Sequence, residues 1–253
     1  MGLSNLMIQI ARVAAWEVAG LSRPLFILLL SVVFSFYIPS SFVGHPMMEI
    51  KDQLDLYSIA ARDLSESIAN AGVVKFYVPL ILIISFSVMN TFTREFDSGL
   101  AKFYLSLPVS KLAVIAGKLL GSFLTIYSVE ILVSLLYAYL LEPSNFLNYF
   151  LRLDSAITLL SRLFCELFFI FGVTTYICIL APKSWVAIVL STFSLYSFLL
   201  VNELQPSLKW YLPPQVFCAG EWPLQFFGIL FISISILLML WSFYAFVRRL
   251  EVT

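Results

Sequence analysis

The sequence contains little charge, few cysteines and almost no histidine. Only 12% of its 253 residues are charged, about half the fraction of an ordinary soluble domain, which excludes that class. Fifteen basic and fifteen acidic residues leave no net charge, so the overall balance does not indicate a nucleic-acid partner. Three cysteines do not make a disulfide framework.

The motifs of membrane-embedded hydrolases are also missing. There is no GxSxG or HExxH segment, and the single histidine, His45, cannot supply a zinc site of the latter kind. No pair of acidic residues stands at helical spacing inside an apolar run. An intramembrane enzyme would have to depend on Glu130, Glu166 or His45, and it is the least supported class of function.

One segment resembles part of a phosphate-binding loop but fails the test. The pattern GxxxxGK[ST] ending at Gly117-Lys118 would need glycine at 112 and serine or threonine at 119. The chain has Leu112 and Leu119 there. We therefore expect no ATP, cofactor or metal in this chain, and no catalytic residue.

Long apolar runs are what the sequence has in abundance, with 61% of residues hydrophobic. A helix needs about 20 apolar residues to cross a bilayer core. We predict an all-α polytopic membrane protein forming a single transmembrane domain, 1–253. Its six expected spans are 24–43, 73–92, 112–141, 156–180, 185–201 and 224–247.

An even number of spans places both termini on one side of the membrane. Most of the fifteen basic residues fall in segments on that side, which the positive-inside rule assigns to the cytoplasm. We therefore predict a multi-pass protein of a plasma (cell) membrane, of prokaryotic type, with cytoplasmic N and C termini.

Three segments outside the spans have helical or turn-forming patterns. Residues 1–23 are amphipathic and predict an interfacial helix lying on the bilayer, either as an anchor or in contact with a soluble partner. Residues 44–72 carry an apolar stripe and predict a helical outer segment, packed on the protein or on an external accessory protein. Residues 202–223 predict a broken, re-entrant-like outer loop.

Residues 93–121, TREFDSGLAKFYLSLPVSKLAVIAGKLLG, form a charged block between the second and third spans. Its charges exclude it from lipid, so it is expected to face the cytoplasm. At its end Gly117 and Gly121 fit GxxxG, a spacing that permits close helix approach.

Charged residues are also predicted inside the spans. Glu130 lies in the third, and Arg162 and Glu166 lie one turn apart in the fourth. Because a charge at a helix centre costs about 2.5–3.5 kcal/mol on insertion scales, each must face protein or water. Arg162 and Glu166 can form an i, i+4 pair. A polar lining of a transport route and an interhelical clamp both remain open.

The charged block resembles the signature segment of ABC type-2 transporter permeases. In that family a glutamate and a glycine lead into a leucine-rich stretch, a Pro-Val-Ser-Arg/Lys turn and a Gly-Lys at the third span. These elements stand here as Glu95, Gly99, Leu105, Leu107, Pro108, Val109, Ser110, Lys111, Gly117 and Lys118. Leu100 stands where threonine is usual, and the outer segment is longer than in minimal members.

The resemblance implies a permease subunit of an ATP-driven exporter. A cytoplasmic coupling helix within 93–111 would contact a separate ATP-binding subunit, which would carry the ATP and Mg²⁺. Two such subunits would serve two permease chains, as a homodimer or heterodimer in the lipid bilayer. The residues expected at the coupling interface are Arg94, Glu95, Asp97, Ser98, Gly99, Lys102, Pro108, Ser110, Lys111 and Lys118.

Within that segment, Asp97 and Ser98 are expected to cap the coupling helix, and Pro108 to stop it. Gly99 would allow close approach of the partner, and the charges of Arg94, Glu95, Lys102 and Lys111 are expected to be exposed. The alternative hypothesis is a membrane scaffold that tethers partners without transporting anything.

Overall fold

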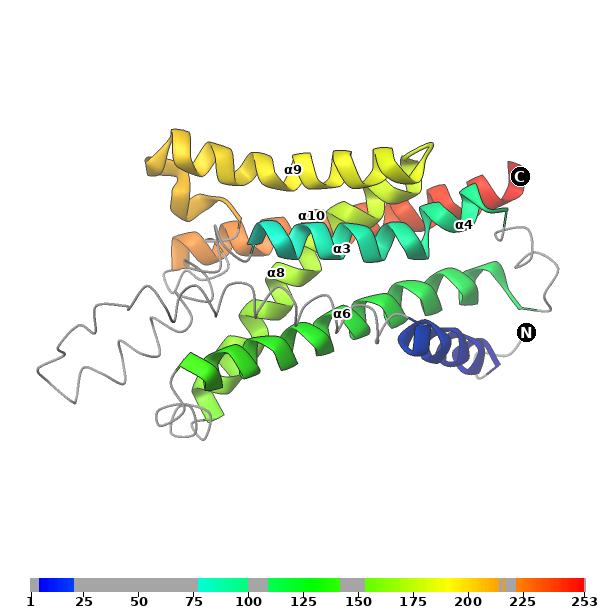
Figure 1. Cartoon of the computed structure of the whole chain (residues 1–253), viewed down its shortest axis with the longest axis horizontal. Helices are drawn as coiled ribbons and strands as arrows, with labels where there is room; N and C mark the ends of the chain where they lie inside the picture. The colour runs from blue at the N-terminus through cyan, green and yellow to red at the C-terminus, as the bar shows by residue number, and fades with distance from the viewer. Residues whose placement is uncertain are drawn as a thin grey trace, which may run out of the picture.

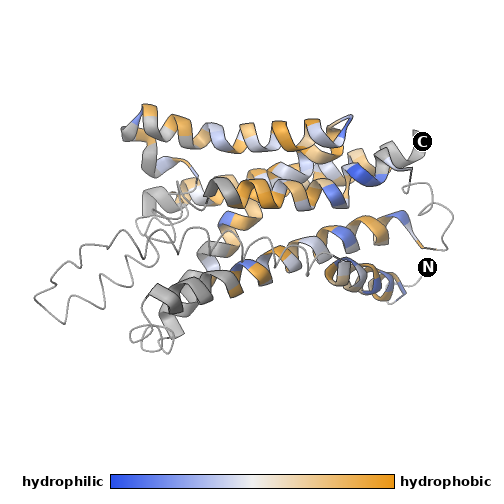
Figure 2. Cartoon of the chain, in the orientation of Figure 1, coloured by the Kyte–Doolittle hydropathy of each residue, from blue (hydrophilic) through white to orange (hydrophobic). Residues whose placement is uncertain are grey.

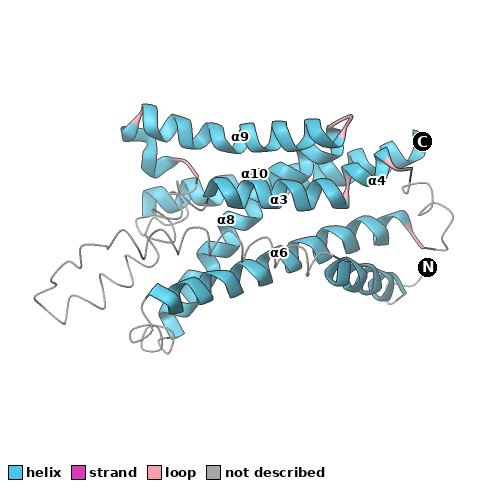
Figure 3. Cartoon of the chain, in the orientation of Figure 1, coloured by secondary structure: helices cyan, strands magenta, loops and turns pink. Residues whose placement is uncertain are grey.

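The computed structural model describes residues 5–20, 77–99, 109–141, 153–213, 216 and 222–252, and every regular element in these ranges is a helix (Figures 1 and 3). The all-α prediction is confirmed for this part of the chain. The N-terminal helix covers residues 5–20. It is followed by α3 (Tyr77–Thr91), α4 (Thr93–Asp97), α6 (Lys111–Leu141), α8 (Leu153–Leu180), α9 (Ser184–Leu204), the 3-10 helix η2 (Pro206–Tyr211) and α10 (Trp222–Val252).

Helices occupy each predicted span from 73–92 onward, whereas 24–43 and the outer segment 44–72 lie outside the described residues. Two stretches are long and apolar enough to cross a membrane: Lys111–Leu132 in α6 and Phe226–Arg248 in α10. By length and composition, the described helices therefore support two spans rather than the six expected.

Four helices, α3, α8, α9 and α10, pack most densely and form what we call the four-helix group. Helices α8 and α10 approach each other closely at Gly172, where an added Cβ would lie 3.0 Å from the Cβ of Ser235. The buried core of the group is aliphatic and aromatic. It includes Ile81 and Ile84 on α3, Ile170 on α8 and Leu195 on α9.

Helix α6 lies along one side of this group (Figure 1) and contacts α8 through aromatic side chains. The rings of Phe123 and Tyr127 on α6 stand 5.4–5.7 Å from those of their aromatic neighbours on α8. The Tyr127 hydroxyl also donates a hydrogen bond to the Leu160 carbonyl at 3.0 Å. We call this set the aromatic cluster; it consists of Phe123, Tyr127, Phe164, Phe168 and Phe171.

The N-terminal helix, α4, the first turns of α6 and the last turns of α10 lie at the same end of the molecule (Figure 1). Hydrophilic residues gather there, on the N-terminal helix, on α4 and at the start of α6 (Figure 2). Among the residues whose side chains the structure describes, the exposed cations on or next to these helix ends include Arg12, Arg94, Lys111, Lys183 and Arg248. Most of the intervening helix surface is apolar.

Large apolar side chains are exposed along α9 and α10. Phe193 on α9 and Leu237 on α10 are each 65% exposed. Contiguous apolar surface of this kind marks a face that contacts lipid or another protein. The residues include Trp185, Val189, Phe193, Leu200 and Leu204 on α9, and Phe226, Ile229, Leu237, Leu240 and Trp241 on α10.

Candidate functional site

The charged block starts as a continuation of α3. The backbone N–H of Phe92 still donates to the Val88 carbonyl, and α4 begins directly after it at Thr93. The Thr93 hydroxyl donates to the Cys178 carbonyl at 2.6 Å and so fixes the start of α4 to the last turn of α8. Helix α4 is thus held by the four-helix group.

The end of α4 differs from the expected start of a coupling helix. Asp97 closes α4, and the Ser98 hydroxyl donates back to the Glu95 carbonyl at 3.3 Å, so within the described residues both belong to a helix end. Gly99 follows with φ +75°, a left-handed conformation that glycine adopts without steric cost. Therefore no single helix runs through 94–111. Residues 100–108, with Lys102 and Pro108, lie outside the described part.

Helix α6 begins with a serine cap that also contacts the N-terminal helix. The Ser110 hydroxyl accepts the backbone N–H of Ala113 at 3.2 Å, as an N-cap residue does. The backbone N–H of Ser110 in turn donates to the side-chain oxygen of Gln9 at 3.3 Å. Ser110 was predicted to face a partner subunit; here it ties two segments of this chain together.

Two glycines of α6 lie directly under the N-terminal helix. A Cβ added to Gly117 would lie 2.8 Å from Val13 Cγ1, and one added to Gly121 would lie 2.6 Å from the Ala14 carbonyl oxygen. The close approach permitted by the GxxxG spacing is thus made to the N-terminal helix. The apolar face of this helix includes buried Ala14 and packs against α6 at these positions, while its location on the bilayer surface stays a prediction.

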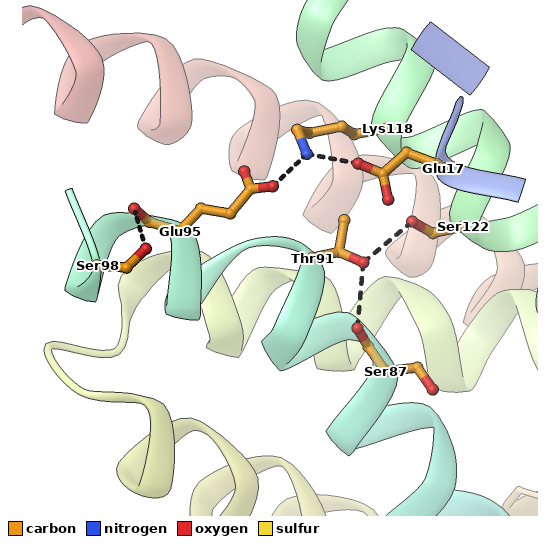
Figure 4. Close-up of polar contacts among 7 residues, drawn as sticks. All are labelled: Glu17, Ser87, Thr91, Glu95, Ser98, Lys118 and Ser122. Carbon is orange, nitrogen blue, oxygen red and sulfur yellow. Dashed lines mark hydrogen bonds and ion pairs between the residues drawn. The ribbon is translucent and has the colours of Figure 1, made fainter. Parts of the chain in front are cut away.

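An ion triad joins the three segments at this point (Figure 4). The Lys118 ammonium lies 2.5 Å from the Glu17 carboxylate of the N-terminal helix and 2.6 Å from the Glu95 carboxylate of α4. Lys118 is 0% exposed, Glu17 6% and Glu95 9%. We call these three residues the charged junction.

This burial corrects one sequence-based expectation. Glu95 was predicted as an exposed charge that orients a partner, and Lys118 as part of the same interface. Both are buried and paired with each other. A lysine inside an apolar helix must be paired because an isolated buried ammonium is strongly disfavoured, and the two carboxylates satisfy this requirement within the chain.

Polar side chains extend the junction along α3 and α6. The Ser122 hydroxyl lies 3.5 Å from that of Thr91, and the Thr91 hydroxyl donates to the Ser87 carbonyl at 3.1 Å (Figure 4). The ring centroid of Trp16, on the N-terminal helix, lies 5.4 Å from the Lys118 ammonium. Such an aromatic face adds a favourable cation–π contact.

An open pocket of about 450 Å³ lies beside the junction. Residues from the N-terminal helix, α3 and α4 line it, including Trp16, Glu17, Gly20, Asn90 and Glu95. Since Glu17 and Glu95 both line the pocket, solvent has a route to the two carboxylates of the triad.

The other predicted coupling residues divide into exposed and undescribed ones. Arg94 and Lys111 are exposed, as expected, and Arg94 donates to the Asn90 side-chain oxygen at 3.3 Å. The side chain of Asp97 lies outside the described part. The side chain of Arg162 does too, so the predicted Arg162–Glu166 pair stays a prediction.

The structure brings together two of the predicted intramembrane residues. Glu130 on α6 and Glu166 on α8 are both half-buried and close enough for their charges to interact. The sequence alone offered no titratable neighbour for Glu130. Among the described residues no group of His, Cys, Asp and Glu could hold a metal ion.

Glu17 is the site residue that the sequence analysis missed. It follows Leu6, Ile10, Val13 and Ala14 at helical spacing, on the face of the N-terminal helix that is otherwise apolar. A carboxylate on a packing face needs a partner, and Lys118 lies seven residues into an expected span. A charged residue on each of two apolar helix faces is the sequence pattern that could have indicated this ion pair.

No protein-family model, curated protein or solved structure matches this chain. The functional argument therefore depends on the geometry described above and on the sequence motif. What this geometry provides is a mechanical connection, because one buried lysine joins the charged block, the N-terminal helix and α6.

Proposed function

We propose that this chain is the membrane-spanning permease subunit of an ATP-driven transporter, operating as an exporter with a separate ATP-binding subunit. The observation that carries the proposal is the Glu95–Lys118 contact. These motif residues stand near the two ends of the charged block, and their 2.6 Å bond ties α4 to α6. A force applied to α4 would reach α6 through it.

The distribution of exposed charge supports the proposed orientation. The exposed cations described at the α4 end include Arg94 and Lys111, which flank the part of the block outside the described residues. A cluster of cations at one end of a helical membrane protein is typical of the cytoplasmic side. The proposal places all six predicted spans in the membrane, with the charged block on that side.

The division of roles within the block follows from burial. Buried Glu95 and Lys118 would transmit movement from α4 to α6, whereas Arg94 and Lys111 are exposed at the surface, where a second protein could contact them. Exposed rim charges of this kind set orientation and partner choice more than affinity. Two permease chains with two ATP-binding subunits would form the complete transporter. Its substrate is not specified by these residues.

The test is copurification of a nucleotide-hydrolysing subunit with the tagged full chain from its native membranes. The complex should hydrolyse ATP, and the chain stripped of partners by high salt should not. The double substitution Arg94→Glu/Lys111→Glu should remove most of the copurifying ATPase activity. Lys183→Glu is the matched control, since it reverses an exposed cation at the same end but outside the block.

Two outcomes would contradict the proposal. One is the absence of any ATPase from the purified complex; the other is equal recovery of ATPase with the charge-reversed and control chains. In another outcome, an ATPase copurifies whose rate of ATP hydrolysis changes neither when candidate substrates are added nor when Glu95 is replaced. That result would favour the scaffold hypothesis instead.

A further inference from the structure

The described helices fall into two bodies. The contacts that hold each body together differ from the contacts that join one body to the other. One body is the four-helix group with α4 attached through Thr93 and α3. The second is the N-terminal helix with α6, which we call the helix pair. The pair is joined by the Gly117 and Gly121 contacts and by the Gln9–Ser110 hydrogen bond.

Contacts within the helix pair are close and involve backbone. At Gly121 the approach is so tight that one added methyl group would lie 2.6 Å from the Ala14 carbonyl oxygen. Backbone contacts of this kind leave little freedom for one helix to move on the other. The helix pair is therefore expected to move as one unit.

Three features help to join the bodies: the aromatic cluster, the Glu95–Lys118 bond, and a buried contact of α6 with α3 in which the Ser122 and Thr91 hydroxyls lie 3.5 Å apart. The aromatic cluster packs α6 against α8 by ring-to-ring contacts that tolerate a small change of angle. Five to nine residues earlier on α6, roughly 8–14 Å along the helix axis, Lys118 forms its bond to Glu95. The first contact is broad and apolar; the second is a single directional charge pair beside an open pocket.

The two carboxylates of the triad belong to different bodies. Glu17 and Lys118 are both in the helix pair, whereas Glu95 is in α4. If the bodies separate at this point, Lys118 keeps Glu17, and the released Glu95 meets water in the pocket that it already lines. Neither charge is left buried and unpaired, which is the costly outcome for ion pairs.

We infer that Lys118 is a latch: its bond to Glu17 persists, while its bond to Glu95 opens and closes as α4 moves relative to α6. The aromatic cluster is the pivot of this movement. Glu17 is the positioning residue that keeps the lysine in place when the latch is open. This inference does not depend on the proposed function, because it concerns only the movement of the chain's own helices.

The experiment measures two distances by spin labelling of the full chain in lipid nanodiscs, with the three native cysteines replaced by alanine. The exposed sites Arg94 and Lys111 carry labels in one sample, across the latch. Arg12 and Lys111 carry them in the other, within the helix pair. Each sample is prepared with native Glu95, with Glu95→Gln and with Glu17→Gln.

Glu95→Gln should raise the ratio of long to short 94–111 distances about tenfold or more, since it replaces the charged acceptor of the Lys118 hydrogen bond with a neutral one. The 12–111 distances should stay unchanged. Glu17→Gln should leave both distributions near those of the native chain, because Lys118 keeps Glu95 and the glycine contacts hold the helix pair. Ser98→Ala, which removes only a contact within the α4 end, should also change neither.

The latch is rejected if Glu95→Gln leaves the 94–111 distances unchanged, or if it alters the 12–111 distances to the same extent. A purely structural triad would give the second result, with both pairs of labels loosened together. If Glu95→Gln does not yield folded protein, Glu95→Asp replaces it. That variant keeps the charge but shortens the reach to Lys118, and the same two distances decide.

Discussion

The charged junction and the aromatic cluster hold the same helix, α6, by opposite means. The junction depends on three side chains, with one ammonium shared between two carboxylates. The cluster has five rings sharing several contacts, so no one pair determines it. Helix α6 is therefore held at the junction by a few directional contacts, and at the aromatic cluster by a larger area of apolar packing.

The largest expected effect comes from breaking the junction at its centre. Lys118→Met leaves two buried carboxylates without their ammonium, and we expect a loss of about 3–5 kcal/mol in the free energy of unfolding. Denaturant titration in detergent, followed by circular dichroism, measures it. In the triple variant Lys118→Met/Glu17→Gln/Glu95→Gln most of the loss should disappear; persistence of the full loss would show that packing, not charge, stabilises the junction.

The aromatic cluster should respond to loss of volume rather than of charge. Phe123→Ala removes the ring shared by most contacts of the cluster, and the free energy of unfolding should fall by about 3 kcal/mol. The same titration tests this. Phe193→Ala, at a 65% exposed position on α9, is the matched control and should cost much less. Equal losses at the two positions would mean that the cluster contributes no special packing.

Tight packing within the helix pair sharpens the comparison further. Gly121→Ala inserts a methyl group against the Ala14 carbonyl, and overpacking of this kind costs about 1–3 kcal/mol. Gly20→Ala is its control, because no atom lies within 4 Å of the added carbon there. Unfolding titrations of the two variants should separate clearly. A Gly121→Ala chain as stable as the native one would contradict the close contact.

The smallest effect is expected at the end of α4. Gly99→Ala places a Cβ at φ +75°, for which the left-handed conformation costs about 1 kcal/mol. Gly99→Asn should cost less, since asparagine visits this region more readily than alanine. Unfolding titrations rank the two variants. If alanine and asparagine are equally well tolerated, the turn after α4 does not depend on this conformation.

The positions of the helices could be predicted from the sequence because helix formation depends on residues that are close together along the chain. Long apolar runs form helices wherever they stand, and the predicted 112–141 and 156–180 correspond to α6 and α8 within three residues at each boundary. We did not predict from the sequence that Ser110 caps α6 or that Gly99 ends the turn after α4 in a left-handed conformation.

The candidate site could be predicted only in part from the sequence. Glu95, Ser110, Gly117 and Lys118 could be chosen as motif residues, but their environment could not, since exposure depends on which helix covers them. Glu95 was expected at the surface and is buried. Glu17 carried a local signal, a carboxylate on an apolar face, but nothing in the sequence identifies the lysine about a hundred residues later as its partner.

By itself, the sequence determined the helical class, the low charge, the positions of the helices and the presence of a charged block between two of them. These features follow from hydrophobicity and backbone propensity along a continuous stretch of chain. Only the tertiary structure decided that the N-terminal helix covers Gly117 and Gly121, and that Glu17, Glu95 and Lys118 share one buried site. That pairing follows from the cost of burying an isolated charge, which is settled only when the helices pack.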